Sequence, residues 1–238
     1  YHRAGSFGPG GQSIVGDDHL NVTHDAEGDT AMTERFCQEV LGDRKPAFAV
    51  LWQCEPDHSQ HSHVLGSPEH LAAIAAADAN AGTVAEAVDK LNATGEDILL
   101  LIGSDHGHET VGEIVDLDAK LVAAGFKAHT DSNDVVVASQ GFSAFVYLAD
   151  NQRHKIADIA LYLDSLDGVG DVYAGADLES IGQRSDGALA IAVDAAKSDT
   201  ETAYGIPGLS AAFANRFSMT LEMGKGEHGG LGKYEQNP

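Results

Sequence analysis

The chain has 238 residues and a formal net charge of −23 at pH 7, from 37 acidic and 14 basic side chains. So large an acidic excess argues against binding to the nucleic-acid backbone or to anionic membrane surfaces. With 43% hydrophobic residues the chain can build a sizeable core. The sequence contains no run of 18 apolar residues of the kind that predicts a membrane span. A periplasmic or secreted location and a cytoplasmic location both remain open.

The first 29 residues are rich in Gly, Asp, His and Asn, which is typical of a loop. The chain opens on Tyr1 without a Met or a charged-then-apolar leader, so we expect either a removed signal or a piece of something longer. The two cysteines, Cys37 and Cys54, are too few for a disulfide framework and are expected to be buried thiols.

The first elements that the spacing predicts are helices and strands in alternation. Apolar residues at helical intervals predict a helix over 30–42, and the apolar run 45–54 predicts a buried strand. A long helix follows over 67–92, with Ser67 as its N-cap, and then a second buried strand over 98–102. A capping box at Thr110 and Glu113 predicts a helix over 110–125.

The second half of the chain continues the same alternation. The predicted elements are a hairpin over 134–149, a helix over 151–166, a strand over 169–175, a short helix over 176–182, a strand over 187–195 and a loop-like tail from 203. Strands that alternate with helices predict an α/β fold with a mostly parallel central sheet flanked by helices.

Three polar clusters follow apolar segments, where ligands collect at the carboxyl ends of strands. Asp57 and His61 are spaced i, i+4, so one turn of helix would put both on one face. Asp105 and His106 precede a glycine that frees the backbone, and His228 stands between glycines in GEHGG. Asp and neutral His together suit zinc or a similar divalent metal.

These motifs, PDHSQH (56–61), SDHG (104–107) and EHGG (227–230), stand in an order that resembles the alkaline phosphatase superfamily. The branch that the chain resembles most is the nucleotide pyrophosphatase/type I phosphodiesterase group, which includes phosphonoacetate hydrolases. Gly66 falls where the first motif of that branch continues with glycine, whereas Gln60 replaces a frequent glycine. The resemblance covers about residues 45–232.

The resemblance implies a site for two divalent metal ions, with zinc as the expected metal. Asp57, His61 and His228 would hold one ion, and Asp105 and His106 the other. A family Thr or Ser nucleophile would attack the phosphorus, and the ions would polarise the phosphoryl oxygen. The implied function is hydrolysis of phosphoric esters or phosphonates on a small phosphate- or phosphonate-bearing substrate.

In the family the nucleophile lies more than a hundred residues before the first motif, but only 56 residues precede Asp57 here. Thr23, Thr30 and Thr33 are too close to it. We therefore expect that the chain, residues 1–238, is the C-terminal portion of one alkaline-phosphatase-like domain. A missing N-terminal segment of the same enzyme would supply the nucleophile, and a cap insertion is expected at about 126–205.

Other interpretations remain open at this stage. The chain could be a metal-holding binding module without catalysis, or a phosphomonoesterase, sulfatase or phosphoglycerate mutase of the same superfamily. His58 and His63 flank His61 and are interpreted as solvated or supporting residues, and His108 as pocket lining at most.

Overall fold

The computed structural model describes residues 22–214 and 221–231. Within them the chain divides into two compact units, which are described separately. The first unit comprises 22–58 and 72–102, and the second comprises 59–71 together with the described residues from 103 onward. Most of the predicted N-terminal loop and part of the tail lie outside the described residues.

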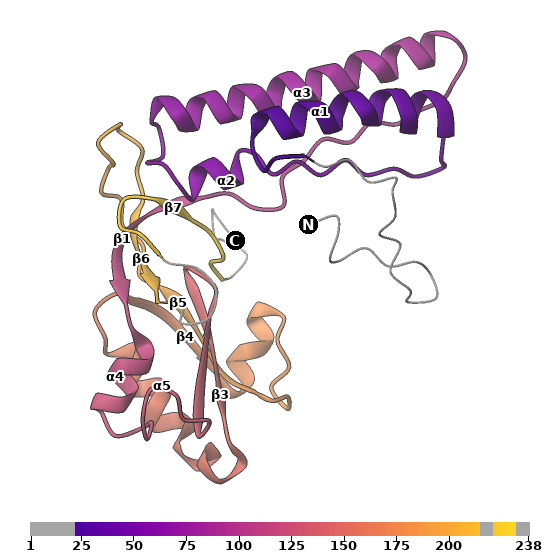
Figure 1. Cartoon of the computed structure of the whole chain (residues 1–238). Coiled ribbons are helices and arrows are strands. Elements are labelled where there is room, and N and C mark those ends of the chain that lie inside the picture. Colours follow the sequence, from indigo (N-terminus) through magenta and orange to yellow (C-terminus); the bar gives the residue numbers. More distant parts are fainter. Residues whose placement is uncertain (1–21, 215–220, 232–238) are drawn as a thin grey trace. The chain divides into compact units, whose positions relative to one another are not determined.

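Two helical stretches organise the first unit (Figure 1). Helix α1 (Ala26–Arg35) starts after Asp25, whose carboxylate accepts the Gly28 N–H at 2.8 Å, and it runs on into the π-helical η1 (Phe36–Arg44). Helix α3 (Pro68–Ala93) contributes its residues from 72 onward. Thr30 of α1 donates to the Asn80 carboxamide at 3.2 Å, which ties the two helices together. Both predicted helices are confirmed, although α1 begins within the predicted loop.

The two predicted buried strands of this unit are not strands in the structure. Residues 47–54 and 96–104 have no hydrogen-bonded strand partner among the described residues. Large apolar side chains are exposed along both segments, with Phe48 83%, Trp52 64% and Leu101 82% accessible. An apolar run favours burial of a segment on both faces. A strand also requires backbone hydrogen bonds to a neighbouring strand, and these two segments do not pair with each other.

Two sheets lie in the second unit. One has the order β6-β1-β7, formed by β1 (Glu109–Val115), β6 (Leu209–Phe213) and β7 (Gly226–Glu227). The other has the order β2-β3-β5-β4, formed by β2 (Val135–Ser139), β3 (Ser143–Leu148), β5 (Leu189–Ala195) and β4 (Val169–Ala174). The second sheet is antiparallel throughout, and β1 pairs parallel with β6 but antiparallel with β7.

The α/β class is thus confirmed, but the strand orientation is mixed rather than mostly parallel. The physical reason is the short connection between β2 and β3, which allows only a hairpin. The helices of this unit are α4 (Leu117–Ala123), α5 (Ile156–Asp164), and the 3₁₀ helices η2 (Asp150–Lys155) and η3 (Gly175–Ile181). The predicted hairpin and the helices and strands between 151 and 195 are confirmed.

The predicted helix over 110–125 is wrong in its first half. Thr110, Val111 and Val115 lie in β1 and are buried, and such β-branched residues suit a pleated surface. The helix begins only after Asp116, whose carboxylate accepts the Ala119 N–H at 2.9 Å. The tail, predicted as a loop, contributes β6 and β7. The supposed capping box at Thr110 is therefore a strand sequence, and the true cap is Asp116.

The core of the second unit lies between the two sheets and the helices α4 and α5. Every residue of β5 is buried, and Ile191, Phe142 and Phe213 have no exposed surface. The region predicted as a cap, 126–205, contains the four-stranded sheet, and its role as a cap stays a prediction.

Among the described residues, no helix has the length and apolar character needed to cross a membrane.

Candidate metal centre

The pairing of β1 with β7 brings two distant histidines face to face. In this antiparallel pair Thr110 lies opposite Gly226 and Glu109 opposite Glu227. One step further along, His108 and His228 face each other, and their ring centroids are 5.1 Å apart. The site therefore begins where the short β7 ladder ends.

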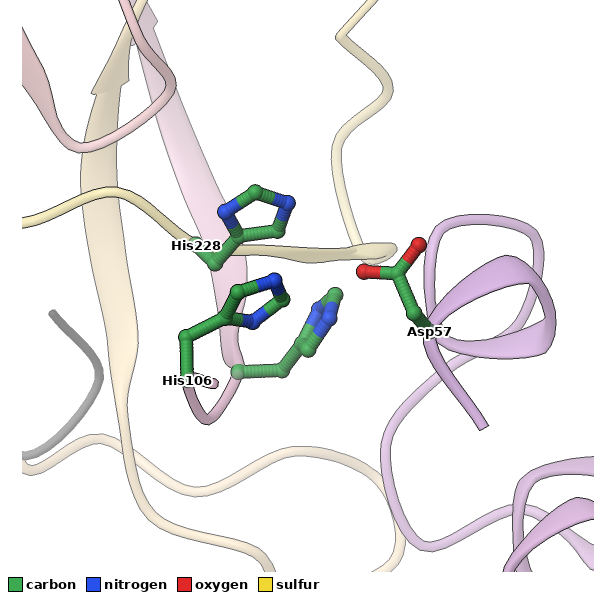
Figure 2. Close-up of side chains that lie close together, drawn as sticks. Asp57, His106 and His228 are labelled. Atoms are coloured by element: carbon green, nitrogen blue, oxygen red, sulfur yellow. The ribbon is translucent and has the colours of Figure 1, made fainter. Parts of the chain in front are cut away.

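His106 stands two residues before His108 and reaches the same place. Its ring stacks on that of His228, with centroids 3.8 Å apart and an interplanar angle of 18°. Figure 2 shows the two rings lying one above the other, each carried by a separate chain segment. The ring centroids of His106 and His108 are 5.4 Å apart.

His61 follows the one-turn helix α2 (Asp57–Gln60). A contact with β7 places its ring beside those of His108 and His228. Its Nδ1 is 3.2 Å from the Gly226 carbonyl oxygen, and its ring centroid is 4.9 Å from that of His108 and 5.1 Å from that of His228. A Cβ at Gly226 would come within 2.7 Å of the Gln60 carbonyl oxygen. A glycine is therefore needed for the close approach that seats His61.

Glu227 is the carboxylate beside these rings, and it is 5% exposed. Its Oε1 lies 3.8 Å from His61 Nδ1 and 4.0 Å from His228 Nε2, and it accepts the His228 backbone N–H at 3.0 Å. A buried carboxylate is costly unless it is compensated by positive charge or hydrogen bonds. A cation held by the neighbouring rings would supply such compensation.

The residues fit a divalent metal of the zinc class by their donor chemistry. The ligand atoms of His106, His108 and His228 lie within 4.8 Å of one another, and so do those of His61, Glu227 and His228. The carbonyl of Gly226 can only accept, so Nδ1 of His61 carries the proton and Nε2 holds the lone pair. The same argument applies to His106, whose Nδ1 is 3.2 Å from the Gly107 carbonyl oxygen.

The structure thus brings together three of the five predicted ligands, His61, His106 and His228, within the second unit. Asp105 has a half-exposed carboxylate, 3.4 Å from His106 Nε2. Asp57 starts helix α2 and belongs to the first unit. The assignment of these five residues as ligands stays a prediction.

Sequence reasoning missed the participation of His108 and Glu227. The signal was present in the alternation His106-Gly107-His108 and in the pair Glu227-His228, but only the register of β1 against β7 gives it meaning. Periodicity alone places side chains on a face of their own strand. It does not say which residue of another strand stands opposite.

A buried carboxylate of the first unit positions the chain just ahead of Asp57. Asp29 of α1 is 1% exposed and accepts the N–H groups of Cys54 and Glu55 at 2.8–3.1 Å. Burial, and then the charge of Asp29, raise the pKa of Cys54 to about 12. The thiol therefore stays protonated at neutral pH, which makes it a poor nucleophile and a poor metal ligand.

Neighbouring histidines have structural partners instead. His63 Nδ1 is 3.1 Å from the Ser59 carbonyl oxygen. His70 Nδ1 accepts the Gly66 N–H at 2.8 Å, and its Nε2 faces the Gln60 side-chain amide at 3.0 Å. Gly66 has φ +89°, and a Cβ there would meet Ile206 at 2.7 Å, so this turn requires glycine. His70 therefore secures the loop that carries His61.

We expect His70 to make the protein less stable in mild acid. Burial lowers the pKa of His70 below its ordinary value, so the unfolded chain binds the proton more readily than the folded one. Stability from this residue is full above about pH 6.5 and is lost as the pH falls toward the lowered value. His70→Asn keeps an acceptor for Gly66 but does not titrate.

The measurement is denaturant unfolding at pH 8 and pH 5.5, followed by circular dichroism. The difference in unfolding free energy between the two pH values should be smaller in His70→Asn than in the unmodified protein. His129→Asn, at an exposed position, is the control and should retain the full difference. An equal pH dependence in all three proteins would assign the acid sensitivity to other groups.

Comparison with known proteins gives a match over most of the chain. The family model described as type I phosphodiesterase / nucleotide pyrophosphatase matches residues 12–230. A comparison with curated protein sequences gives no match.

Two similar solved structures are of phosphonoacetate hydrolase from Sinorhizobium meliloti 1021, in complex with phosphonoformate and with phosphonoacetate. The TM-scores are 0.59 and 0.58 and the identities 16% and 15%. Each alignment covers 92% of this chain but 51% of the hydrolase chain, so the present chain spans about half the length of these structures.

Proposed function

The chain belongs to the type I phosphodiesterase / nucleotide pyrophosphatase family, and on this premise we propose that it is the metal-holding part of a hydrolase of phosphoric esters or phosphonates. One observation carries the proposal. His61, His106 and His228 come from three motifs far apart in the sequence, yet their rings gather at one point of the second unit.

The proposed cofactor is a pair of divalent ions, with zinc favoured by the imidazole donors. Asp57, His61 and His228 would hold one ion, and Asp105 and His106 the other. When bound, such ions supply Lewis-acid polarisation of a phosphoryl oxygen and stabilise the negative charge that develops on it. Asp57 and Asp105 would add the negative charge that neutral imidazoles lack.

We propose a small anionic substrate, which bound metal ions would hold against the repulsion of the acidic chain. The chain carries a net charge of −23, which repels phosphates unless local positive charge is present. The two similar structures contain phosphonoacetate and phosphonoformate, both small phosphonates. A phosphate or phosphonate of comparable size is therefore the class of substrate that we propose, whether monoester, diester or phosphonate.

The proposed nucleophile is a Thr or Ser hydroxyl supplied by polypeptide outside this chain, namely an N-terminal segment of the same enzyme. Support comes from the share of the phosphonoacetate hydrolase structures that the chain covers, 51%. In that arrangement the present residues would bind ions and orient the phosphoryl group. The hydroxyl would form a covalent phosphoryl–oxygen bond, with release of the leaving group.

The test compares this 238-residue chain with the full-length natural protein, each loaded with Zn²⁺. Both are assayed on p-nitrophenyl phosphate, bis(p-nitrophenyl) phosphate and phosphonoacetate. The expected result is turnover by the full-length protein alone, lost in chelator and restored by Zn²⁺. The preferred compound among the three also distinguishes monoester, diester and phosphonate chemistry.

Two outcomes would contradict parts of the proposal. Turnover by the 238-residue chain alone, sensitive to chelator, would show that its own residues supply the nucleophile. Full-length protein that binds two ions and turns over none of the three compounds, nor a wider panel of esters, would favour a metal-holding binding module. Protein that binds no divalent ion at all would remove the basis of the hydrolase assignment.

A further inference from the structure

Two segments of the first unit, 47–53 and 99–103, expose apolar side chains. Both segments leave the same end of the pair of helices (Figure 1), and they begin close together because Lys45 Nζ lies 2.6 Å from Glu96 Oε1. Six large apolar side chains on them have exposed fractions between 63% and 83%: Phe48, Val50, Trp52, Leu99, Leu101 and Ile102. These six residues are called the apolar face below. Single exposed apolar residues are ordinary, whereas a group of this kind marks an interaction site.

The exposure along these segments alternates as it does along a strand. Positions 49, 51 and 53 are half-buried, whereas positions 48, 50 and 52 are exposed. Position 100 is half-buried between the exposed positions 99 and 101. The half-buried side of the first segment is turned to α1, because the Gln53 side-chain amide donates to the Thr33 hydroxyl at 3.0 Å. A period of two with one covered side is the pattern of a strand that has a layer packed on one face only.

The backbone of the two segments offers edges for pairing. Within the described part of the chain, no N–H or carbonyl group of 47–53 or 99–103 takes part in a backbone hydrogen bond. The residues next to them are held in place. Asp29 accepts the Cys54 N–H at 3.0 Å, and the Asn92 carboxamide binds both the N–H and the carbonyl of Ile98, at 2.8 and 3.0 Å. Anchored segments with a row of unpaired backbone groups are templates for an added strand.

We propose that the apolar face and the unpaired edges beside it are the docking surface for the N-terminal segment of the same enzyme. That segment would add a strand along 47–53, 99–103 or both, and its apolar side chains would cover the apolar face. The inference rests on the proposed function, which places such a segment outside this chain. The chain covers 51% of the phosphonoacetate hydrolase chain, which leaves a comparable length of polypeptide to form strands.

A second copy of this chain is a poorer occupant of the surface. Each copy carries a net charge of −23, so two copies repel each other. A segment of the same polypeptide docks in an intramolecular step at high effective concentration, which a separate partner lacks. The N-terminal segment is therefore the occupant that charge and connectivity favour.

Hydrogen exchange followed by mass spectrometry tests the strand pairing without any substitution. In the full-length protein, amides of 47–53 or 99–103 should exchange at least about 100-fold more slowly than in the 238-residue chain, because paired amides exchange only when the structure opens. Peptides from β5, which is buried and paired on both sides, are the control and should exchange alike in both proteins. Equal exchange of both segments in the two proteins would overturn the inference.

Trp52 reports whether the apolar face is covered, because it is the single tryptophan of the chain and is 64% exposed. Acrylamide quenching is measured on the 238-residue chain and on the full-length protein, with Trp52→Phe in each to subtract other emission. Trp52 of the full-length protein should emit at shorter wavelength and be quenched severalfold less. A Trp52 signal that is quenched alike in both proteins would show that the face stays exposed.

One substitution in two contexts separates docking from a local effect. Leu101→Asp should leave the urea midpoint of the 238-residue chain unchanged, because surface substitutions cost little. In the full-length protein it should lower the midpoint, because the carboxylate would be buried without a partner. Leu161→Asp, at a 71% exposed leucine of α5, is the matched control and should change neither protein. Leu101→Ala repeats the comparison with a milder change, and equal shifts in both proteins would contradict docking.

Failure of this inference is distinguishable from failure of the proposed function, because none of these measurements depends on metal or turnover. Full-length protein that hydrolyses esters with Zn²⁺ but leaves 47–53 and 99–103 unprotected would overturn the inference alone. Protection that is lost when a dimer, followed by sedimentation, dissociates on dilution would assign the surface to a second copy and also overturn it. Protection in a full-length monomer without turnover would support the docking surface while the proposed hydrolase fails.

Discussion

Replacing His228 with Ala is expected to weaken binding of the Zn²⁺ ion that His228 would hold by more than about 100-fold. His228 is the ring that both candidate ligand groups share, one with His106 and His108 and the other with His61 and Glu227. It also stacks directly on His106 at 3.8 Å. Its removal therefore damages two groups at once. Loss of a residue that merely orients a ligand costs 10- to 100-fold in affinity, so we expect a loss larger than about 100-fold here.

The measurement is chelator competition together with the metal content of protein recovered after gel filtration. His154→Ala, an exposed position in η2, is the control and should retain full metal content. In the full-length protein, His228→Ala should also lose turnover in proportion to the metal. Undiminished affinity in His228→Ala would show that the rings are not a metal site and would remove the main support for the proposed hydrolase.

The second large effect is expected at Lys127, which is buried beside α4. Its Nζ lies 3.0 Å from the Asp118 carboxylate, and the two side chains are 2% and 7% exposed. The ammonium also donates to the carbonyl of Ser132 at 3.0 Å and to that of Val135. A buried carboxylate left without its cation is strongly unfavourable, so Lys127→Met should lower the unfolding free energy by about 3–5 kcal/mol.

A second variant tests whether the loss of unfolding free energy comes from the uncompensated charge of Asp118. Lys127→Met combined with Asp118→Leu removes both charges and should recover a large part of the loss, because a well-packed apolar pair often replaces a buried ion pair at little cost. Urea unfolding monitored by circular dichroism measures both. The exposed pair of Arg184 and Asp186, at 81% and 73% accessible, is the control, and Arg184→Met should barely move the midpoint. A double variant as unstable as the single one would place the cost in lost packing.

Several elements could be predicted because their information is local. Helix α3 has Ser67 and Pro68 at its start and an apolar stripe at helical spacing, and the structure places it at Pro68–Ala93. The hairpin of β2 and β3 and the fully buried β5 follow equally from short-range alternation and apolar runs. The three histidines could be named because each stands in a compact motif at the end of an apolar segment.

Other expectations failed where a distant partner decides the outcome. Residues 45–54 and 98–102 are apolar enough for buried strands, but a strand also needs a neighbouring strand to pair with. Neither segment has such a partner among the described residues. Phe48, Trp52 and Leu101 are exposed as a result. Thr110 and Glu113 match a helix start in spacing, but the pairing of β1 with β6 takes the same residues into a sheet. Local propensity is overruled there by non-local hydrogen bonds.

The sequence by itself determined the α/β class, the long helix, the antiparallel hairpin and the candidate ligands His61, His106 and His228, because capping, periodicity and motif spacing are properties of short segments. Only the tertiary structure decided that His108 and Glu227 stand with them. The deciding contact is the two-residue ladder between β1 and β7, which sets residue 108 opposite residue 228 across 120 positions of chain. Such a register is set by how two remote strands pair, and no local pattern encodes it.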